Sequence, residues 1–233
     1  MYAKDIALVA HLLYRFDYGG LEVLVAECIK RLPAPGFRHV VLCLTDYNPD
    51  FAKAVLPPGV EIICLNKQPG LGLGMHWRIW KLLRRLRPSV LHSYNLAALE
   101  YQLAAALAGV AVRVHAEHGR DAADPDGLNR KHNALRRMLR PFVDCYVAVS
   151  SDLDRWLREQ VGIPAAKVLM IRNGVDTTRF QRDSVSSQAP TPPDWPFQPE
   201  DFVIGTVGRI QDVKNQEALI HAFAALHQRQ PQH

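Results

Sequence analysis

The feature that most limits how this chain can fold is the alternation of short apolar segments with longer amphipathic ones. The short segments are rich in β-branched residues and carry few charges, which is typical of strands buried on both faces of a sheet. Strands that alternate with helices favour a parallel sheet covered on both sides, and so an α/β fold. The expected strands span residues 6–10, 39–44, 60–65, 90–92, 112–117, 145–149 and 168–171. The expected helices span residues 21–32, 77–86, 96–107, 128–139 and 153–161.

The composition changes after residue 180, where this alternation stops. Five prolines fall between residues 190 and 199 without apolar periodicity, which is typical of a linker or an irregular surface segment. An apolar strand at 202–207 and an amphipathic helix at 217–226 then follow. One strand and one helix cannot bury their apolar faces alone. We therefore expect a complete domain over 1–180, a linker over 181–200 and the start of a second, incomplete domain over 201–233.

Charge and composition narrow the class of protein without choosing a partner. The 233 residues are 48% hydrophobic and 22% charged, as in a soluble enzyme with a packed core. The net charge of +5 favours anionic partners such as nucleotides, phosphorylated lipids, acidic membrane surfaces or nucleic acid. The sequence shows no signal-peptide pattern, no apolar run near the ~18 residues of a membrane span and no C-x-x-C pair. We expect a cytoplasmic protein with reduced cysteines and no metal site.

Two glycines follow the first expected strand, where the first long helix begins. Gly19 and Gly20, with Glu22 just after them, would let the backbone come close to a ligand. The N-terminus of the helix attracts negative charge. The place suits a phosphate or the polar groups of an acceptor, and a simple turn is the alternative.

A histidine follows the strand at 112–117, at the edge where open parallel sheets bind ligands. The imidazole of His118 could hydrogen-bond a sugar hydroxyl or support developing charge, or it could bond a nearby carbonyl. The preceding Glu117 could orient His118 or act as an acid near a helix N-terminus. His92 and His115 lie within apolar runs, so we expect them in the core.

A glycine turn with two cations starts the expected second domain. Gly208, Arg209 and Lys214 follow the strand at 202–207 and precede the helix at 217–226. This arrangement again suits an anion, and two cations can neutralise a diphosphate leaving group without a metal. A solvated basic loop is the alternative.

Two stretches, 76–88 and 130–140, each hold five cations and no acidic residue. A basic amphipathic helix can lie on an anionic bilayer, and a solvated helix face over a core stripe is the alternative. Contact through 76–88 would make the protein peripheral to the inner face of the plasma membrane. No nucleic-acid-binding motif accompanies the charge, so we expect no nucleic-acid partner.

Taken in order along the chain, five short motifs resemble those of glycosyltransferase family 4 (GT4), whose members have the GT-B architecture. The motifs are Gly19-Gly20-Leu21-Glu22, Glu117-His118-Gly119, Val149-Ser150, Asn173-Gly174-Val175-Asp176 with Phe180, and Gly208-Arg209 with Lys214. In detail the chain is similar to bacterial sugar transferases associated with exopolysaccharide and PEP-CTERM systems. The runs 14–17, 96–100 and 117–121 carry that likeness.

The resemblance implies two facing Rossmann-like domains, the first mainly for the acceptor and the second mainly for the donor. It implies metal-independent transfer of a hexosyl group, with retention, from a nucleotide-diphosphate sugar to a lipid-linked or polysaccharide acceptor in exopolysaccharide biosynthesis. No cofactor is implied. Gly19, Gly20 and Gly208 would approach the donor phosphates, His118 would contact the donor sugar, and Arg209 and Lys214 would hold the leaving diphosphate. Glu22, Glu117 and Arg120 would lie on the acceptor side.

One departure from the family pattern concerns the second domain. The family carries two glutamates, seven residues apart, that bind the sugar and the ribose, and this chain ends before that point. We therefore expect the 233-residue chain alone to lack normal transferase activity. A nucleotide-sugar epimerase of the same architecture and a non-catalytic module that binds a partner or a membrane are the alternatives. An epimerase needs carboxylates in the cleft, whereas the acidic loop with Asp121, Asp124 and Asp126 is typical of a surface loop.

Overall fold

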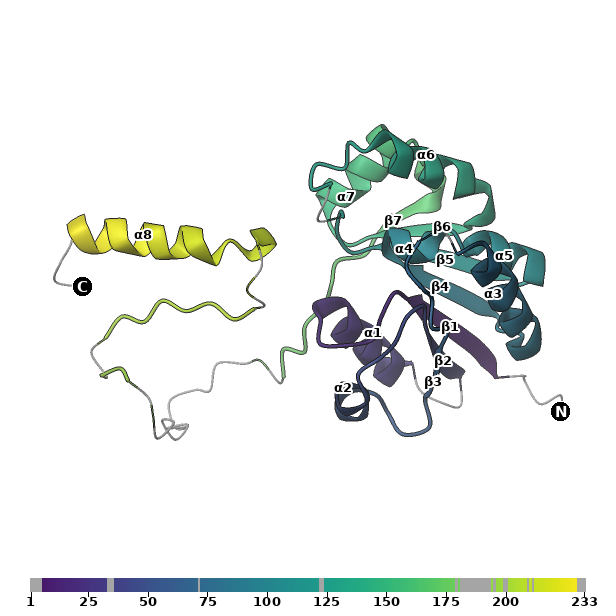
Figure 1. The fold of residues 1–233 in the computed structure, drawn as a ribbon, viewed down its shortest axis with the longest axis horizontal. Coiled ribbons are helices and arrows are strands. Elements are labelled where there is room, and N and C mark those ends of the chain that lie inside the picture. The colour runs from purple at the N-terminus through teal and green to yellow at the C-terminus, as the bar shows by residue number, and fades with distance from the viewer. Residues whose placement is uncertain are drawn as a thin grey trace. The chain divides into compact units, whose positions relative to one another are not determined.

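The computed structural model divides into two compact units, Met1–Gly174 and Val175–His233 (Figure 1). It describes residues 6–32, 36–70, 72–121, 124–178, 180, 194, 196–198, 201–208, 210 and 212–229.

One parallel sheet of seven strands forms the centre of the first unit, within the residues just given. The order of the strands is β3-β2-β1-β4-β5-β6-β7. Their bounds are β1 (Ala7–Leu13), β2 (Phe37–Cys43), β3 (Glu61–Cys64), β4 (Val90–Tyr94), β5 (Val112–Glu117), β6 (Cys145–Ala148) and β7 (Val168–Met170). The seven strands expected in this unit are confirmed, with ends that differ by a few residues.

Helices connect the strands and confirm the expected α/β pattern. They are α1 (Gly20–Arg31), α2 (Pro49–Val55), α3 (Leu73–Leu86), α4 (Asn95–Leu99), α5 (Gln102–Ala108), α6 (Arg130–Leu139) and α7 (Ser151–Trp156). A π turn, Leu157–Val161, continues α7.

Two helical segments differ from the sequence expectation. The segment 96–107 is not one helix, because the N–H of Tyr101 bonds back to the carbonyl of Ala98 in a tight turn that separates α4 from α5. The short helix α2 was missed. Its signal is an Asn48 cap, whose side chain accepts from the Phe51 N–H at 3.1 Å, followed by Pro49 in the first turn.

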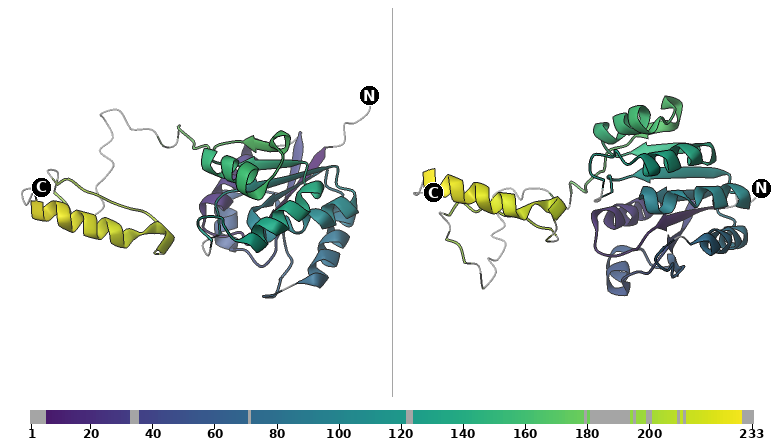
Figure 2. Two further views of the ribbon diagram at one scale, coloured as in Figure 1. Left: turned by 90° about the horizontal axis from the view of Figure 1, so that it is seen from above. Right: turned by 45° about the horizontal axis from the view of Figure 1, so that its top comes forward.

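Apolar side chains fill both sides of the sheet, and helices cover both sides (Figure 2). On one side, Leu12 of β1 belongs to a cluster with Ile79 of α3. On the other side, Leu13 belongs to a cluster with Ile29 of α1. A third cluster around Tyr146 packs α6 and α7 near β6. This two-sided burial explains why the strands read as continuous apolar runs.

The strand order changes direction at β1. The chain runs outward from β1 through β2 to β3, and then returns to place β4 on the other side of β1. In open parallel sheets, ligands bind beyond the carboxyl ends of the strands at such a switch point. The turns after β1, β4 and β5 therefore frame the position at which a site is expected.

The second unit holds α8 (Gln216–Arg229), which confirms the helix expected at 217–226. The strand expected at 202–207 is wrong, because none of the described residues 201–208 is in a strand. A strand needs a hydrogen-bonded neighbour, and the described part of this unit supplies none. Phe202 and Val207 are accordingly exposed.

Three further properties apply to the part of the chain that the structure describes. It contains no helix long and apolar enough to cross a membrane. It contains no group of three or more histidine, cysteine, aspartate or glutamate residues placed to hold a metal ion. The four cysteines are unpaired, and Cys43 is buried whereas Cys28 is exposed on α1, outside the expected core.

Candidate active site

The loop after β1 brings the N-terminus of α1 to the carboxyl edge of the sheet. Buried Phe16 anchors this loop, since its N–H donates to the Asp46 carbonyl at 3.3 Å and its carbonyl accepts the Asn48 N–H at 2.9 Å. Gly19 is the N-cap residue of α1 and offers no capping side chain. The helix end carries partial positive charge, which favours an anion at this place.

The two glycines at this helix end have different surroundings. A Cβ atom at Gly20 would meet nothing within 4 Å, so the backbone is open to an approaching group. A Cβ atom at Gly19 would overlap the carboxylate of Glu22, which folds back over the start of the helix. The close approach that phosphates require is therefore possible at Gly20, whereas Gly19 makes room for Glu22.

Asn95 joins the carboxyl ends of β4 and β5. Its side-chain Oδ1 accepts the backbone N–H of His118 at 2.9 Å. Its own backbone is left-handed, with φ of 57°, a conformation that asparagine tolerates better than most residues. Sequence reasoning missed Asn95, although a polar residue directly between a buried strand and a helix is a signal for this edge of the sheet.

The imidazole of His118 is mostly withdrawn from solvent. Burial, with a smaller contribution from the neighbouring His115, lowers the pKa of His118 to about 4, while Glu117 opposes the change. The Nδ1 atom is buried and has no hydrogen-bond partner among the described residues. The imidazole is therefore neutral near pH 7, with one nitrogen able to donate and the other able to accept.

Glu117 lies in the interior of the first unit. Its Oε1 accepts from Arg136 Nε at 2.7 Å and from His115 Nε2 at 3.3 Å, and all three side chains are buried. Burial alone would raise the pKa of Glu117, but His115 and Arg136 together hold it below the usual value. This carboxylate anchors α6 to β5, and its expected place on the acceptor side stays a prediction.

Arg120 is also engaged within the fold. Its guanidinium pairs with the Asp152 carboxylate at 2.6 Å and lies 5.6 Å from the ring centre of Trp156. The Trp156 indole N–H donates to the Gly127 carbonyl at 2.9 Å. Arg120 therefore helps to fix the 124–128 turn against α7, and its expected place on the acceptor side stays a prediction.

A chain of hydrogen-bonded polar groups, buried at His11 and Tyr94 and open to solvent at His39, lies on the α1 side of the sheet. The Leu32 carbonyl accepts from His39 Nε2 at 2.7 Å, so His39 Nδ1 accepts from His11 Nε2 at 3.1 Å. His11 Nδ1 then accepts the Tyr94 hydroxyl proton at 2.8 Å, and that oxygen accepts from His92 Nδ1 at 2.9 Å. The Tyr94 ring lies 5.8 Å from the ring of His118. With one ring proton on His39, the Leu32 carbonyl thus sets the direction of each hydrogen bond in the chain.

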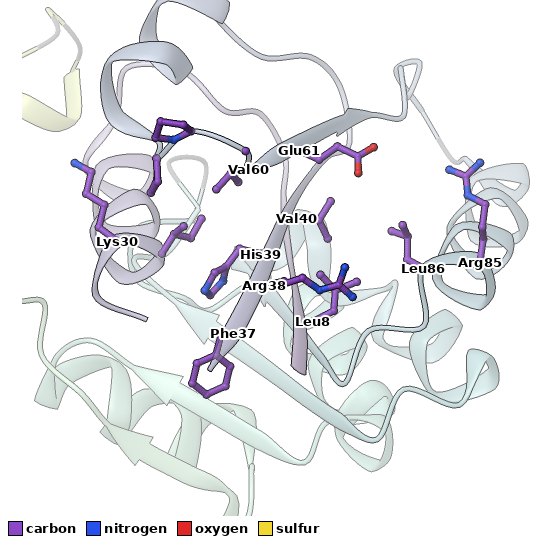
Figure 3. Close-up of a pocket in the computed structure, with 14 residues that line it drawn as sticks. Leu8, Lys30, Phe37, Arg38, His39, Val40, Val60, Glu61, Arg85 and Leu86 are labelled. Atoms are coloured by element: carbon purple, nitrogen blue, oxygen red, sulfur yellow. The ribbon is translucent and has the colours of Figure 1, made fainter. Parts of the chain in front are cut away.

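A hollow of about 770 Å³ lies at the opposite, amino edge of β1, β2 and β3 (Figure 3). Lys30, Arg38 and Arg85 bring positive charge to it, and Glu61 brings one carboxylate. His39 also lines this hollow. The hollow does not include Gly20 or His118, so it is separate from the candidate site.

Comparison with known proteins assigns the chain to a family. Residues 18–179 match the family model described as Glycosyltransferase Family 4. The chain belongs to glycosyltransferase family 4. No curated protein matches the chain.

Solved structures with the same fold include other glycosyltransferases. Anabaena HepE in complex with UDP and glucose has 18% identity and a TM-score of 0.57, covering 73% of this chain and 45% of HepE. The lipopolysaccharide outer core galactosyltransferase WaaB has 15% identity and a TM-score of 0.55, covering 72% of this chain and 46% of WaaB. The chain therefore spans less than half the length of these two proteins.

An epimerase shares the fold as well. UDP-N-acetylglucosamine 2-epimerase from Rickettsia bellii has 12% identity and a TM-score of 0.51, covering 72% of this chain and 45% of the epimerase. The glycosyltransferase structures superpose with higher TM-scores. At these identities the likeness shows the fold alone, which is the expected α/β fold of GT-B type.

The residues that this family 4 chain was expected to use for the donor diphosphate belong to the second unit. Lys214 is exposed at the end of a short 3-10 turn, Asp212–Lys214. A Cβ atom at Gly208 would lie 4.0 Å from Lys214 Cγ, so the glycine turn passes close to this side chain. Arg209 lies outside the described residues. The roles of these three residues stay predictions.

Proposed function

We propose that this family 4 protein transfers a hexosyl group, with retention, from a nucleoside-diphosphate sugar to a lipid-linked or polysaccharide acceptor. We place the reaction in the cytoplasm, in bacterial exopolysaccharide biosynthesis. The observation that carries the proposal is the open helix N-terminus at Gly20 on the same sheet edge as neutral His118, held there by Asn95. HepE was solved with UDP and glucose, which supports a nucleotide-sugar as the ligand of this fold.

The chemistry divides between the two units. The partial positive charge at the start of α1 would favour the donor phosphates, and the missing side chain of Gly20 would allow their approach. His118, uncharged at neutral pH, would hydrogen-bond the donor sugar near its reacting carbon. Arg209 and Lys214 would balance the charge of the departing diphosphate, so the reaction would need no metal.

The test is sugar transfer by the protein expressed from its complete gene. A panel of radiolabelled UDP-, GDP- and dTDP-sugars is offered with lipid and saccharide acceptors, and NMR of the product gives its anomeric configuration. His118→Ala should lower kcat by about 10² to 10³, the usual cost of removing one transition-state hydrogen bond. His227→Ala, an exposed histidine of α8, is the matched control. Unchanged kcat in His118→Ala would contradict the assigned role, and an inverted product would contradict retention.

The same assay separates transfer from epimerisation. An epimerase would convert the nucleotide-sugar without any acceptor and would need ionisable carboxylates at the site. Carboxylates around the site are used by the fold: Glu117 is paired with Arg136, and Asp124 accepts the backbone N–H groups of Leu128 and Asn129. Glu22 folds back over the start of α1. We therefore expect no acceptor-independent change of the donor sugar, and its appearance would favour the epimerase.

A further inference from the structure

Helices α3 and α5 form an apolar surface on the side of the sheet away from α1. We define the α3–α5 patch as Leu73, Trp77 and Trp80 of α3 with Leu103 and Leu107 of α5. Leu73, Trp77 and Leu107 are 82%, 56% and 68% exposed, and the patch borders a hollow of about 670 Å³. Large apolar side chains exposed side by side mark an interaction surface, unlike apolar residues scattered singly.

Helix geometry aligns the patch along one side of α3. Leu73, Trp77, Trp80 and Arg84 follow each other at intervals of four, three and four residues, so they share one face. The rings of Trp77 and Trp80 stack with centroids 4.5 Å apart. The Trp80 indole N–H donates to the Leu107 carbonyl at 3.3 Å. Trp80 thus joins the two helices, and Trp77 projects outward.

Exposed cations border the patch, and Glu100, which also lies near it, pairs with His76 of the same hollow at 3.5 Å. Arg78, Lys81 and Arg84 are exposed, and the sequence contains no aspartate or glutamate between Glu61 and Glu100. Lys81 lies over the Trp77 ring at 5.0 Å. In the described part of the chain, neither Arg78 nor Arg84 makes a hydrogen bond or an ion pair. These charges are therefore available to an external anion.

The basic helix α6 makes an instructive contrast. Arg136 pairs with buried Glu117, and Arg137 and Arg140 donate to the carbonyls of Val161 and Gly162 at 2.9 and 3.2 Å. Three of the five cations in 130–140 thus hold the fold together. The segments 76–88 and 130–140 thus have similar charge but different roles. Of the two helices, α3 is the one that combines cations without a partner in the described residues with an exposed tryptophan.

We propose that the α3–α5 patch docks the protein on an anionic lipid bilayer. Leu73, Trp77 and Leu107 would enter the boundary between headgroups and acyl chains, where tryptophan is favoured. Arg78, Lys81 and Arg84 would meet lipid phosphates. Charge complementarity favours this occupant over a second copy of the chain, which would bring an identical basic surface against this one.

The position of the patch relates it to the candidate site. Helix α3 follows β3 and precedes β4 in a parallel sheet, so its N-terminus with Leu73 lies at the carboxyl edge, where Gly20 and His118 also lie. A bilayer under this end of α3 would present a lipid-linked acceptor to that edge. This last step rests on the proposed function, whereas docking itself does not.

The experiment is flotation of the full chain with vesicles of phosphatidylcholine alone or with 30% phosphatidylglycerol. We expect binding only to the anionic vesicles, and quenching of tryptophan fluorescence by brominated lipid. Trp77→Glu should abolish both signals. Lys81→Gln with Arg84→Gln should weaken binding about 30-fold, from ~1 kcal/mol for each charge near the surface. Arg130→Gln with Lys131→Gln, the same charge change on exposed positions of α6, should bind as the wild type does.

Several outcomes would overturn the proposal. Equal binding to neutral and anionic vesicles would remove the role of the cations, and wild-type binding by the Lys81/Arg84 variant would do the same. Absence of flotation, together with a lipid-free dimer that Trp77→Glu dissociates, would assign the patch to a second copy. Circular dichroism and urea transitions check that each variant is folded. Because the assay contains no nucleotide-sugar, its result is independent of transfer activity.

Discussion

At the scale of single residues, Tyr94 is a buried side chain whose hydroxyl makes two hydrogen bonds. Its hydroxyl donates to His11 and accepts from His92. The same row of hydrogen bonds continues through His39 to the backbone carbonyl of Leu32. Neither His11 Nδ1 nor His92 Nδ1 has another hydrogen-bond partner in the described residues. The hydroxyl therefore satisfies two buried groups that water does not reach.

Tyr94→Phe should lower the free energy of unfolding by about 2 kcal/mol or more, because a buried donor and a buried acceptor lose their partner together. Urea unfolding followed by circular dichroism measures this change. Tyr14→Phe, on a tyrosine that is 55% exposed, is the control and should have little effect. Equal midpoints for the two variants would show that the hydrogen-bond chain does not stabilise the fold.

The buried histidines also predict a pH dependence of stability. Burial, together with the nearby His39, lowers the pKa of His11 to about 3, and burial lowers the pKa of His118 to about 4. In the unfolded chain both groups titrate near their usual value of about 6.5. Below that pH the unfolded state binds more protons than the folded state, so stability falls as the pH falls.

We expect the free energy of unfolding to decrease from pH 7 to pH 5, with each of these histidines contributing up to about 1.4 kcal/mol per pH unit below 6.5. The pKa of Glu117 is lowered from its usual value near 4.5, so its protonation affects stability only at pH values below that range and outside this window. Urea titrations at half-unit pH steps measure the slope. His118→Gln should reduce this slope by the contribution of one histidine. A wild-type free energy of unfolding that does not change with pH would contradict the burial of both imidazoles.

At the scale of elements, the start of α1 is where the fold and the proposed ligand have different requirements. A methyl group at Gly20 meets no protein atom, so Gly20→Ala should leave the melting temperature unchanged or slightly higher. The same methyl group would stand where donor phosphates approach. In protein from the complete gene, we expect the kcat/KM for the nucleotide-sugar to fall at least about tenfold. Gly74→Ala in α3, also in open space, is the control and should retain full activity.

The helices and strands also show which features of the fold could be predicted from the sequence. Strands such as β5 and helices such as α1 follow from local apolar patterns, which carry their own periodicity. The roles of Asn95 and Glu117 do not, because they depend on partners that only the folded sheet brings near. Asn95 meets the backbone of His118, and Glu117 meets Arg136 from the next helix. The strand at 202–207 failed for a related reason: an apolar segment becomes a strand only beside another strand.

At the scale of the whole molecule, the two units differ in how much they bury. The first contains three apolar clusters, whereas none of the described residues of α8 is buried. Ile220, Phe223 and Leu226 are all exposed. A helix of this length without packing is marginal in water, since helices shorter than about 12–15 residues rarely persist alone.

Hydrogen exchange followed by mass spectrometry should therefore separate the units in the 233-residue chain. Peptides from α8 should exchange within seconds, and peptides from β1 and β4 should remain protected for far longer, because their amides open only when the sheet does. Equal protection of α8 and β1 would mean that α8 is covered in solution.

The central place of β1 has a consequence for how the protein is made. Of the seven strands of this sheet, β1 leaves the ribosome first, yet one of its edges waits for β4, since Val9 pairs with Val90. Throughout that interval the nascent chain presents an apolar strand with an unpaired edge, which is the kind of surface that aggregates or recruits chaperones. The edge of β1 is therefore covered once β4 is translated, and from then on the unpaired edge passes to each new strand until β7 is added.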